Sequence, residues 1–502
     1  MKRRTFLRTG IAATAALAIP YQRSLAFLYK EAPPAPPDVA AITGAGKEIT
    51  LRGKDIAALS AQLRGRLLMA GDAGYEEARH VLNPSFDKHP ALIAQVTGPA
   101  DTRAAVDFAR DHDNLLLAVK CGGHSFSGKS TCNGGMMIDL SPFRNVRIDP
   151  RARRAWVTGG SLLGQLDHES MAHGLVTTMG TVSHTGVGGL VTGGGTGRVG
   201  RRFGLSVDSL MSVDIVTADG QLRHADEHED ADLFWGVRGG GGNFGIVTDF
   251  EFQLHPMQRR VVGGQIMFPI NRARDVLSLY AEYGPKAPEE LDMILLMIQP
   301  PGGKPGVTGI AVCYSGSEND ADRVLAPIRR LGAPLFDRIR AMDYVALQRS
   351  GDTDDPRARA AYLKSGFVPD VTADLVSAVV DGFEGDPGRT TIVVYQQAGG
   401  AISRIANDAT AFSHRDAAGN LLAITNWAVG DDPTEHIAWT RRYWATIEPL
   451  TQGFYTNDLG PDQTAAQINR NYRENYPRLV QIKNKYDPGN LFRLNANVQP
   501  TV

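Results

Sequence analysis

Glycine is concentrated in three short runs of this chain, and these runs constrain the fold more than any other feature. Between Gly186 and Gly204, nine of nineteen residues are glycine, and smaller clusters lie at 121–125 and 238–245. Glycine loses the most conformational entropy on folding, so it persists where the backbone approaches something closely or adopts positive φ. Successive main-chain N–H groups in such turns bind anions such as a pyrophosphate. The runs therefore predict a bound nucleotide-like cofactor rather than tight turns alone.

A common nucleotide-binding motif does not explain these runs. Residues 195–200 fit the spacing G-x-G-x-x-G, but only ten residues separate Gly200 from Met211. That segment is too short for the crossover helix of a parallel βαβ unit. We therefore reject a nicotinamide-binding Rossmann site.

Hydrophobic periodicity predicts an α+β fold. The expected strands of the first part are 91–96, 115–119, 136–140, 155–157, 211–217 and 244–252, with helices at 104–110 and 162–173. From about Met257 the glycine runs stop. There we expect strands at 293–298, 309–314, 390–395 and 421–427, and helices at 273–283 and 320–331. The second part is thus expected to be one sheet covered by helices, and a helix-rich tail follows from about Thr446.

Charge and composition exclude several kinds of partner. Lysine and arginine number 53 and aspartate and glutamate 54, so no basic field favours nucleic acid or a membrane surface. No apolar run reaches the roughly 18 residues that a membrane span needs. Cys121 and Cys132 could form a disulfide or remain free thiols, and no Cys-x-x-Cys pair suggests zinc. His224 and His228 are expected in a solvated surface loop, so no metal site is predicted.

The N-terminus is typical of an export signal. Adjacent arginines, Arg3 and Arg4, precede Phe-Leu and a short apolar stretch, and small residues near Ala26 offer a cleavage site. The paired arginines resemble a bacterial twin-arginine signal, whose transport system moves folded proteins. We expect residues 1–30 to be this signal and residues 31–48 to be a stiff proline-rich linker, with compact sequence from Ile49. The mature protein is then periplasmic or secreted.

Beyond these patterns, several motifs resemble those of the berberine-bridge-enzyme-like oxidases, members of the vanillyl-alcohol-oxidase flavoprotein superfamily. The resemblance covers roughly Gly71 to Pro500, and its motifs are Gly122-Gly123-His124-Ser125, residues 180–195, residues 232–245, Tyr455-Thr456-Asn457 and residues 487–497. It implies an FAD-binding domain of PCMH type made of two pieces, 49–256 and 446–502. A substrate domain, 257–445, of antiparallel sheet covered by helices would be inserted between them.

The resemblance also assigns residues to the cofactor. His124 would be the covalent attachment, and an imidazole bonded to the flavin tends to raise its reduction potential. Many relatives add a cysteine at the position of Val182, so we expect attachment through His124 alone. Phe126 stands where relatives often have tyrosine, and Thr185 stands where the family controls access of dioxygen to the flavin. The other expected FAD contacts are Cys121, Gly122, Gly123, Ser125, Ser127, Gly128, Gly180, Thr181, Gly186, Gly189, Gly193, Gly194, Gly242, Asn243, Gly245, Ile246, Val247, Tyr455, Asn457, Asn495 and Asn497.

A catalytic base is needed to accept the substrate's proton as hydride leaves. Aligned on the family's motifs, Asn420 falls where related plant enzymes have a carboxylate, and Asp458 falls where they have a tyrosine. Asp458 is therefore the candidate base, although the sequence Asn-Asp-Leu-Gly is equally typical of an exposed turn. Gln396, Asn420 and Tyr395 are expected to orient the substrate, unless Tyr395 points into the core, because neighbouring strand residues face opposite sides.

The resemblance thus implies an exported flavoprotein oxidase. It would oxidise a small alcohol, sugar, amine or phenol with covalently bound FAD and reduce dioxygen to hydrogen peroxide. Two alternatives remain open: a dehydrogenase that uses another electron acceptor, and a flavin-loaded binding protein without turnover, which the missing carboxylate and tyrosine would favour. No oligomeric state is predicted, and the side chains of the second domain are expected to decide the substrate.

Overall fold

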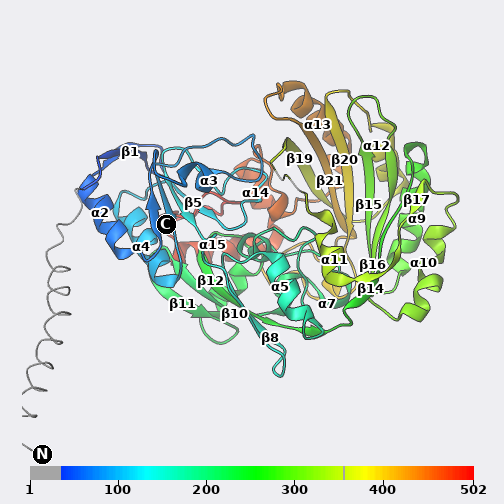
Figure 1. The fold of residues 1–502 in the computed structure, drawn as a ribbon, viewed down its shortest axis with the longest axis horizontal. Helices are drawn as coiled ribbons and strands as arrows, with labels where there is room; N and C mark the ends of the chain where they lie inside the picture. The colour runs from blue at the N-terminus through cyan, green and yellow to red at the C-terminus, as the bar shows by residue number, and fades with distance from the viewer. Residues whose placement is uncertain (1–34, 354, 356) are drawn as a thin grey trace, which may run out of the picture.

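The structure is a computed structural model that describes residues 35–353, 355 and 357–502. It contains two bodies that lie side by side (Figure 1). The first combines the N-terminal half of the chain with its C-terminal end, and the second is built around one large antiparallel sheet. The predicted signal segment, residues 1–30, lies outside the described residues.

The first body contains a four-stranded sheet that leads into the first glycine run. Its order is β3-β4-β6-β5, and β4, β6 and β5 are parallel. The strands are β3 (Arg66–Leu68), β4 (Leu92–Gln95), β5 (Leu117–Lys120) and β6 (Met136–Asp139). Helix α4 (Pro99–Asp111) connects β4 to β5 and buries an apolar stripe that includes Ala105, Val106 and Ala109.

A five-stranded antiparallel sheet, in the order β11-β10-β12-β8-β7, completes the first body. Its strands are β7 (Val146–Asp149), β8 (Arg154–Thr158), β10 (Leu210–Thr217), β11 (Leu222–Ala225) and β12 (Gly245–Gln253), and α5 (Leu163–Met171), α8 (Ala231–Val237) and α15 (Tyr476–Tyr486) accompany it. Residues 195–200 lead only into the four-residue helix α7 (Gly200–Phe203), and β10 pairs antiparallel with both neighbours. This confirms that no Rossmann unit is present in this region.

The expected boundary of the linker is wrong. Residues 39–48, which we expected to be part of an extended linker, contain strand β1 (Val39–Ile42), which pairs with β2 (Glu48–Leu51). Ala41 and Leu51 are 2% and 0% exposed and pack in the core next to α2 (Gly53–Gln62). Burial of these side chains is what brings the segment into the domain.

The second body is an antiparallel sheet of eight strands. Seven follow the order β17-β14-β16-β15-β20-β21-β19, and β18 pairs with β14. The strands are β14 (Arg260–Pro269), β15 (Leu291–Gln299), β16 (Val307–Tyr314), β17 (Phe336–Asp337), β18 (Arg340–Asp343), β19 (Arg359–Val368), β20 (Arg389–Gln397) and β21 (Gly419–Ala428). This is the helix-covered sheet that the sequence predicts.

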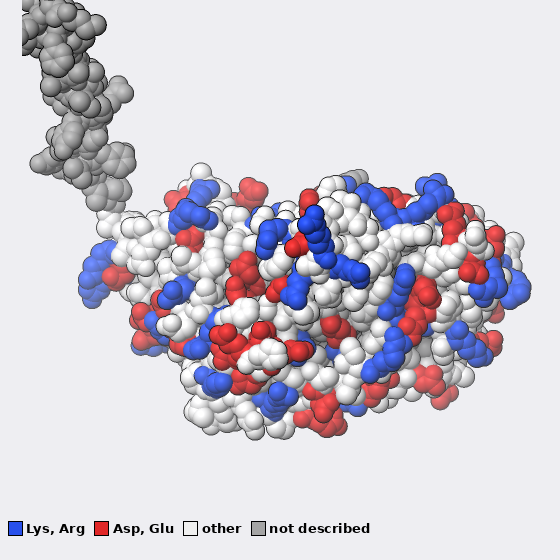
Figure 2. Space-filling model, turned by 90° about the horizontal axis from the view of Figure 1, so that it is seen from below, with Lys and Arg blue, Asp and Glu red and all other residues white. Residues whose placement is uncertain are grey.

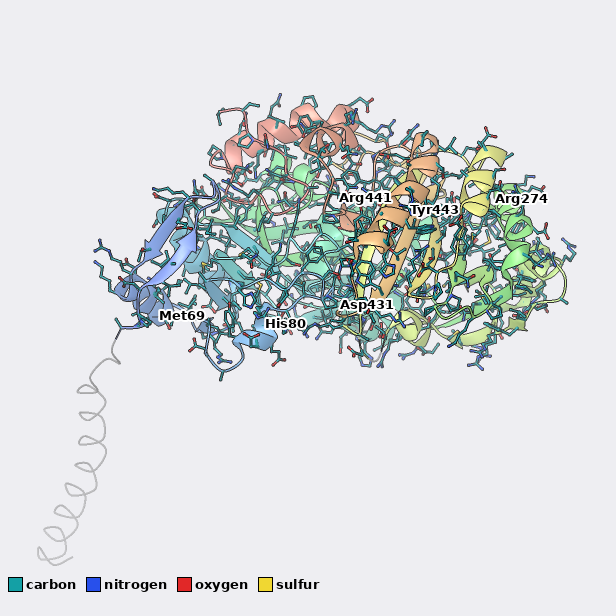
Figure 3. All side chains as sticks on the ribbon, turned by 90° about the horizontal axis from the view of Figure 1, so that it is seen from above. Met69, His80, Arg274, Asp431, Arg441 and Tyr443 are labelled. Atoms are coloured by element: carbon teal, nitrogen blue, oxygen red, sulfur yellow. The ribbon has the colours of Figure 1, made fainter. Side chains whose placement is uncertain are left out.

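One face of this sheet carries the short helix α11 (Tyr344–Gln348), which packs on β14, and the opposite face is covered by four longer helices. They are α9 (Ala273–Tyr283), α10 (Ala321–Arg329), α12 (Ala373–Asp381) and α13 (Thr434–Ile447). They pack on alternate strand residues such as Leu295, Val393 and Leu421. Figure 3 labels Tyr443 on α13, whose hydroxyl donates to the carbonyl of Val379 on α12 at 2.7 Å. Apart from α11, the other sheet face is left for the first body and the site.

The two bodies are joined by buried polar contacts as well as apolar ones. Arg415, between β20 and β21, is 1% exposed at its side chain and pairs in a bidentate fork with Asp208 of the first body, with N–O distances of 2.7 and 2.8 Å. Phe367 and Phe412 join the apolar core of the first body. Such a mixed interface orients the open sheet face with respect to the glycine runs.

The surface carries both charges without separation on the face drawn in Figure 2, where blue and red groups alternate over both bodies. This distribution agrees with the near-zero net charge. Within the part of the chain that the structure describes, no helix has the length and apolar character needed to cross a bilayer.

Candidate active site

A cavity of about 520 Å³ lies between the glycine runs and the open face of the large sheet. The first body contributes all three glycine runs, and the sheet contributes Val394 and Gln396 of β20 and Leu422 and Ile424 of β21. Residues 455–459 and 494–496, from the C-terminal return, close the remaining sides. The volume is within the range of ligand-binding pockets, roughly 300–1,000 Å³.

The expected cofactor residues gather at this cavity. Those that line it are Cys121, Gly122, Gly123, His124, Ser125, Phe126, Ser127, Gly180, Thr181, Val182, Thr185, Gly186, Gly189, Gly242, Gly245, Ile246, Val247, Tyr455, Asn457 and Asn495. Their elements are far apart in sequence, and the two sheets of the first body bring them together. The sequence therefore identifies most of the cavity wall.

Glycines in this wall have two different purposes. At Gly122, a Cβ would lie 2.4 Å from the nitrogen of Gly186, so two loops are in direct main-chain contact. At Gly189 and Gly242, in contrast, a Cβ would meet no atom within 4 Å, and neither residue has a positive φ. Neither sterics nor strain in the protein requires glycine there, so the missing side chains leave room for a ligand that approaches the main chain.

Buried polar atoms in the same wall lack partners. The Ser130 hydroxyl and the Asn495 side-chain oxygen line the cavity region, are buried and have no hydrogen-bond partner among the described residues. Buried polar groups are normally paired, so these two atoms indicate an absent polar ligand. Together with the open glycines, they fit the extended, diphosphate-containing shape of FAD.

Four expected cofactor contacts have other roles. The Asn243 side chain donates to the carbonyls of Gly240 and Ala496 and accepts from the Val498 N–H, so it fastens the C-terminus. A Cβ on Gly193 would collide with Asn457 and one on Gly194 with Phe412, and Gly128, at φ +63°, packs against Phe86. None of these four lines the cavity. Asn497 does not line it either, although its side-chain oxygen is buried without a partner among the described residues.

His124 is held by a second histidine that the sequence analysis did not assign. Its Nε2 lies 2.8 Å from Nδ1 of His184, and its Nδ1 lies 3.4 Å from the Thr185 hydroxyl. Burial and, to a smaller extent, the neighbouring His184 lower the pKa of His124 to about 4. The imidazole is therefore neutral at pH 7. The sequence feature that could have identified His184 is its position inside the family motif at residues 180–195.

Asp458 is buried rather than exposed, so the interpretation as an exposed turn is wrong. It ends the short helix η8 (Thr456–Asp458), is 8% exposed and lines the cavity. Asn420 donates to its Oδ2 at 2.8 Å and also contacts Oε1 of Gln396 at 3.2 Å. Burial raises the pKa of Asp458 to about 7, which outweighs the opposing effect of the Asn420 hydrogen bond.

Tyr395 does not join this group. It neighbours Gln396 on β20, so its side chain is on the helix-covered face, where it is 4% exposed and packs edge-to-face on Tyr280 at 4.9 Å between ring centroids. Of the four expected catalytic residues, the structure brings Asp458, Asn420 and Gln396 together. Tyr395 belongs to the core instead.

Tyr455 and Asn457 position the glycine run at 186–204. The Tyr455 hydroxyl accepts from the N–H groups of Gly195 and Thr196 at 2.8 and 3.2 Å. Asn457 donates to that hydroxyl at 2.7 Å and to the Leu190 carbonyl at 2.9 Å. These contacts attach the C-terminal return to the glycine-rich wall.

The thiols do not form a disulfide. Cys121, Cys132 and Cys313 are all free, and burial raises the pKa of Cys121 to about 11. Val182, in contrast, lines the cavity with a side chain that has no thiol.

Comparison with known proteins identifies the class. Residues 90–226 match the family model described as an FAD binding domain, and residues 460–499 match the model described as berberine and berberine like. The chain is 30% identical over 435 residues to an FAD-linked oxidoreductase of Dictyostelium discoideum, which covers 85% of this chain and 93% of that relative. It is 28% identical to (R)-6-hydroxynicotine oxidase of Paenarthrobacter nicotinovorans, over 87% of this chain and 97% of that enzyme.

Solved structures support the same assignment. The crystal structure of 6-hydroxy-D-nicotine oxidase from Arthrobacter nicotinovorans superposes with a TM-score of 0.79 at 26% identity, covering 87% of this chain and 98% of that one. Glucooligosaccharide oxidase from Acremonium strictum, whose structure is described as containing 6-S-cysteinyl, 8α-N1-histidyl FAD, gives a TM-score of 0.80 at 25% identity. The fold and the site are those of an FAD-linked oxidoreductase. The chain belongs to the berberine-bridge-enzyme-like family of these enzymes, with the PCMH-type fold that the sequence predicts.

Proposed function

We propose that this enzyme is an exported oxidase that removes hydride from a small organic substrate and a proton from the same substrate. The observation that carries the proposal is the group formed by Asp458, Asn420 and Gln396, which faces a cavity built by glycine runs. A carboxyl group with a pKa of about 7 can accept a proton near neutral pH. The carboxylate that relatives have at the position of Asn420 is replaced here by Asp458, which contacts Asn420.

The residues that would hold FAD are the open glycines and the unpaired polar groups of the first body. Gly189 and Gly242 leave room for the cofactor against the main chain, and Ser130 and Asn495 offer polar atoms without protein partners. When bound, FAD supplies the two-electron acceptor for hydride. Asn420 occupies Oδ2 of Asp458, and no donor to Oδ1 is found among the described residues, so Oδ1 is the atom that takes the substrate's proton.

We also propose that FAD is attached through His124 alone. The neutral imidazole has one nitrogen, Nε2, engaged with His184 and the other, Nδ1, near only a hydroxyl. Val182 provides no thiol for a second bond, and Cys121 lies beneath Gly186 with a raised pKa. The lone pair of an uncharged imidazole is what a covalent bond to the ring requires.

Dioxygen is the proposed electron acceptor, because the small Thr185 side chain lines the cavity beside His124. After anaerobic reduction with dithionite, the flavin should reoxidise within seconds in air-saturated buffer and form hydrogen peroxide. The absorbance recovery near 450 nm and a peroxidase-coupled assay measure both. Reoxidation over minutes, with rapid reoxidation by a quinone or dye, would assign the enzyme to the dehydrogenases instead.

Export by the twin-arginine route is proposed from the N-terminal sequence, which lies outside the described residues. Replacing Arg3 and Arg4 with lysine should leave the precursor unprocessed and inside the cell, because the transport system reads the paired arginines. Cell fractionation with an N-terminal mass measurement tests this. A lysine pair that is still processed and found outside the cytoplasm would contradict the proposal.

The alternative of a binding protein without turnover was motivated by the missing carboxylate. The structure weakens this argument for the alternative, because Asp458 supplies a carboxyl group at the cavity. A panel of alcohols, sugars, amines and phenols that never bleaches the flavin absorbance under anaerobic conditions would favour the alternative.

A further inference from the structure

We infer that the substrate is a lipophilic alcohol or amine: an uncharged molecule with one oxidisable polar group and a hydrocarbon body. This inference rests on the proposed function and names the substrate class of the same site. The evidence is the chemical character of the sheet residues that line the cavity opposite the glycine runs: three are aliphatic, and the polar one, Gln396, lies at the end next to Asp458.

The sheet wall of the cavity is aliphatic. Val394 of β20 and Leu422 of β21 are directly paired across the two strands, and Ile424 is paired with Ile392. Val394, Leu422 and Ile424 all line the cavity, and no aromatic side chain of the sheet does. This wall offers apolar contact but no hydrogen-bonding group from its side chains.

The aliphatic surface continues along the sheet beyond the cavity. On the next strand, β15, Leu296 is paired with Val394 and Ile298 with Ile392. Leu296, Ile298 and Ile392 are half-buried, whereas Leu295, Met297 and Val393, which point to the helices, are at most 2% exposed. The strip formed by Leu296, Ile298, Ile392, Val394 and Ile424 is therefore apolar surface that the protein itself leaves incompletely covered.

At the end of this strip that lies in the cavity, the sheet turns polar. Gln396 and Asn420 are paired across β20 and β21, next to Val394 and Leu422, and Asn420 contacts Asp458. A substrate that lies on the strip would place its single hydroxyl or amino group at Asp458. The hydrogen on that oxygen or nitrogen goes to Asp458 as a proton, the adjacent carbon loses its hydrogen as hydride to FAD, and a carbonyl or imine double bond forms.

This arrangement disfavours sugars and charged substrates. A sugar would press several hydroxyl groups against Val394, Leu422 and Ile424, and each buried, unpartnered hydroxyl weakens binding by about tenfold or more. A carboxylate would need a cation at the wall. The lysine that lines the cavity, Lys129, is on the first glycine run, where it donates to the Asn495 carbonyl at 2.6 Å. The sheet wall thus selects for hydrocarbon.

The test uses the holoenzyme and a series of linear alcohols from 1-butanol to 1-octanol. Under anaerobic conditions, binding is measured by the shift of the flavin absorbance spectrum, before and independently of turnover. We expect binding to tighten roughly fourfold per added methylene, as expected for burial of one CH₂ group. Glucose and cellobiose should not shift the spectrum.

Threonine substitutions in the sheet wall test whether that wall binds the hydrocarbon chain of the alcohol. Val394→Thr keeps the shape of the side chain but adds a hydroxyl, so it should weaken octanol binding several-fold, as should Ile424→Thr. Val429→Thr, the same exchange at a residue that is 58% exposed outside the cavity, should leave binding unchanged. Two independent wall positions keep the test valid if one variant folds poorly.

The outcomes separate this inference from the proposed function. Saccharide binding, or alcohol affinity that does not depend on chain length, would overturn the lipophilic substrate class while leaving FAD binding intact. A protein that stays colourless after incubation with FAD would overturn the proposed function. In that case, stabilisation of the apoprotein against heat by the same alcohol series still decides the inference, since the sheet wall does not depend on the cofactor.

Discussion

Replacing Asp458 with asparagine is expected to lower the rate of flavin reduction by about 10²- to 10⁴-fold, the usual contribution of a general base. Asparagine has nearly the same shape but cannot accept the proton. In the unaltered enzyme, the base must be ionised, so the rate should rise with pH through about 7 and then level off. The variant should lack this step. Stopped-flow flavin reduction between pH 5 and 9 measures both effects.

A second buried carboxyl group provides the matched control. Burial also raises the pKa of Asp167 to about 7, but Asp167 is on α5, away from the cavity, where it accepts from Gln348 at 3.1 Å. Asp167→Asn should therefore retain both the rate and the pH step. An Asp458→Asn enzyme with an unchanged rate would remove Asp458 from the mechanism.

Loss of folding does not account for the expected defect. The folded-state pKa of Asp458 lies above its ordinary value of 3.8, so the folded state binds more protons than the unfolded state between about pH 4 and 7. Its contribution to stability is present at low pH and is lost as the pH rises through 7. Asp458→Asn removes this ionisation and should be at least as stable as the unaltered protein at pH 8, as thermal unfolding can show.

Replacing His124 with alanine is expected to abolish covalent attachment of FAD completely. After precipitation with acid, the unaltered protein should remain yellow, whereas the flavin of the variant should stay in the supernatant. The physical reason is that His124 offers a neutral, buried imidazole with Nδ1 unoccupied by a charged group. Mass spectrometry of the peptide that contains His124 should show the added mass of FAD.

Cys121→Ser is the control for this experiment. Cys121 lies three residues before His124 in the same glycine run, and the pKa of its thiol is raised. Its replacement should therefore leave the covalent attachment of FAD in place. Flavin that stays with precipitated His124→Ala protein would place the bond elsewhere. Flavin that leaves the unaltered protein would show that binding is non-covalent.

Most of the fold could be predicted from local sequence patterns. The strands that this prediction missed have identifiable causes. Short runs rich in apolar residues identified β10, β12, β15, β16, β20 and β21, because these strands are largely buried. The strand β1 was missed because prolines precede it, and β14 was missed because Gly263 and Gly264 interrupt its apolar pattern. Pairing with β2 and β16 stabilises these two strands, and pairing partners cannot be seen in a single segment.

The site, like the fold, has features that the sequence could predict and features that depend on contacts between distant segments. Strand alternation from Gln396 and Asn420 would have pointed to Val394, Leu422 and Ile424, so the aliphatic wall was accessible to sequence reasoning. The proximity of His184 to His124 was not, since 60 residues separate them along the chain. Burial of Asp458 was equally inaccessible, because a turn sequence does not specify what covers it.

The sequence by itself determined that this chain holds a dinucleotide-like cofactor on main-chain loops, because glycine runs and their spacing are local properties of the backbone. It also determined the two-part α+β organisation, since hydrophobic periodicity reports which faces are buried. Only the tertiary structure decided that Asp458 is buried at the cavity instead of exposed in a turn, why its pKa is near 7 and which histidine holds His124. Those properties arise from burial and from contacts between distant segments, and these exist only once the two bodies have packed together.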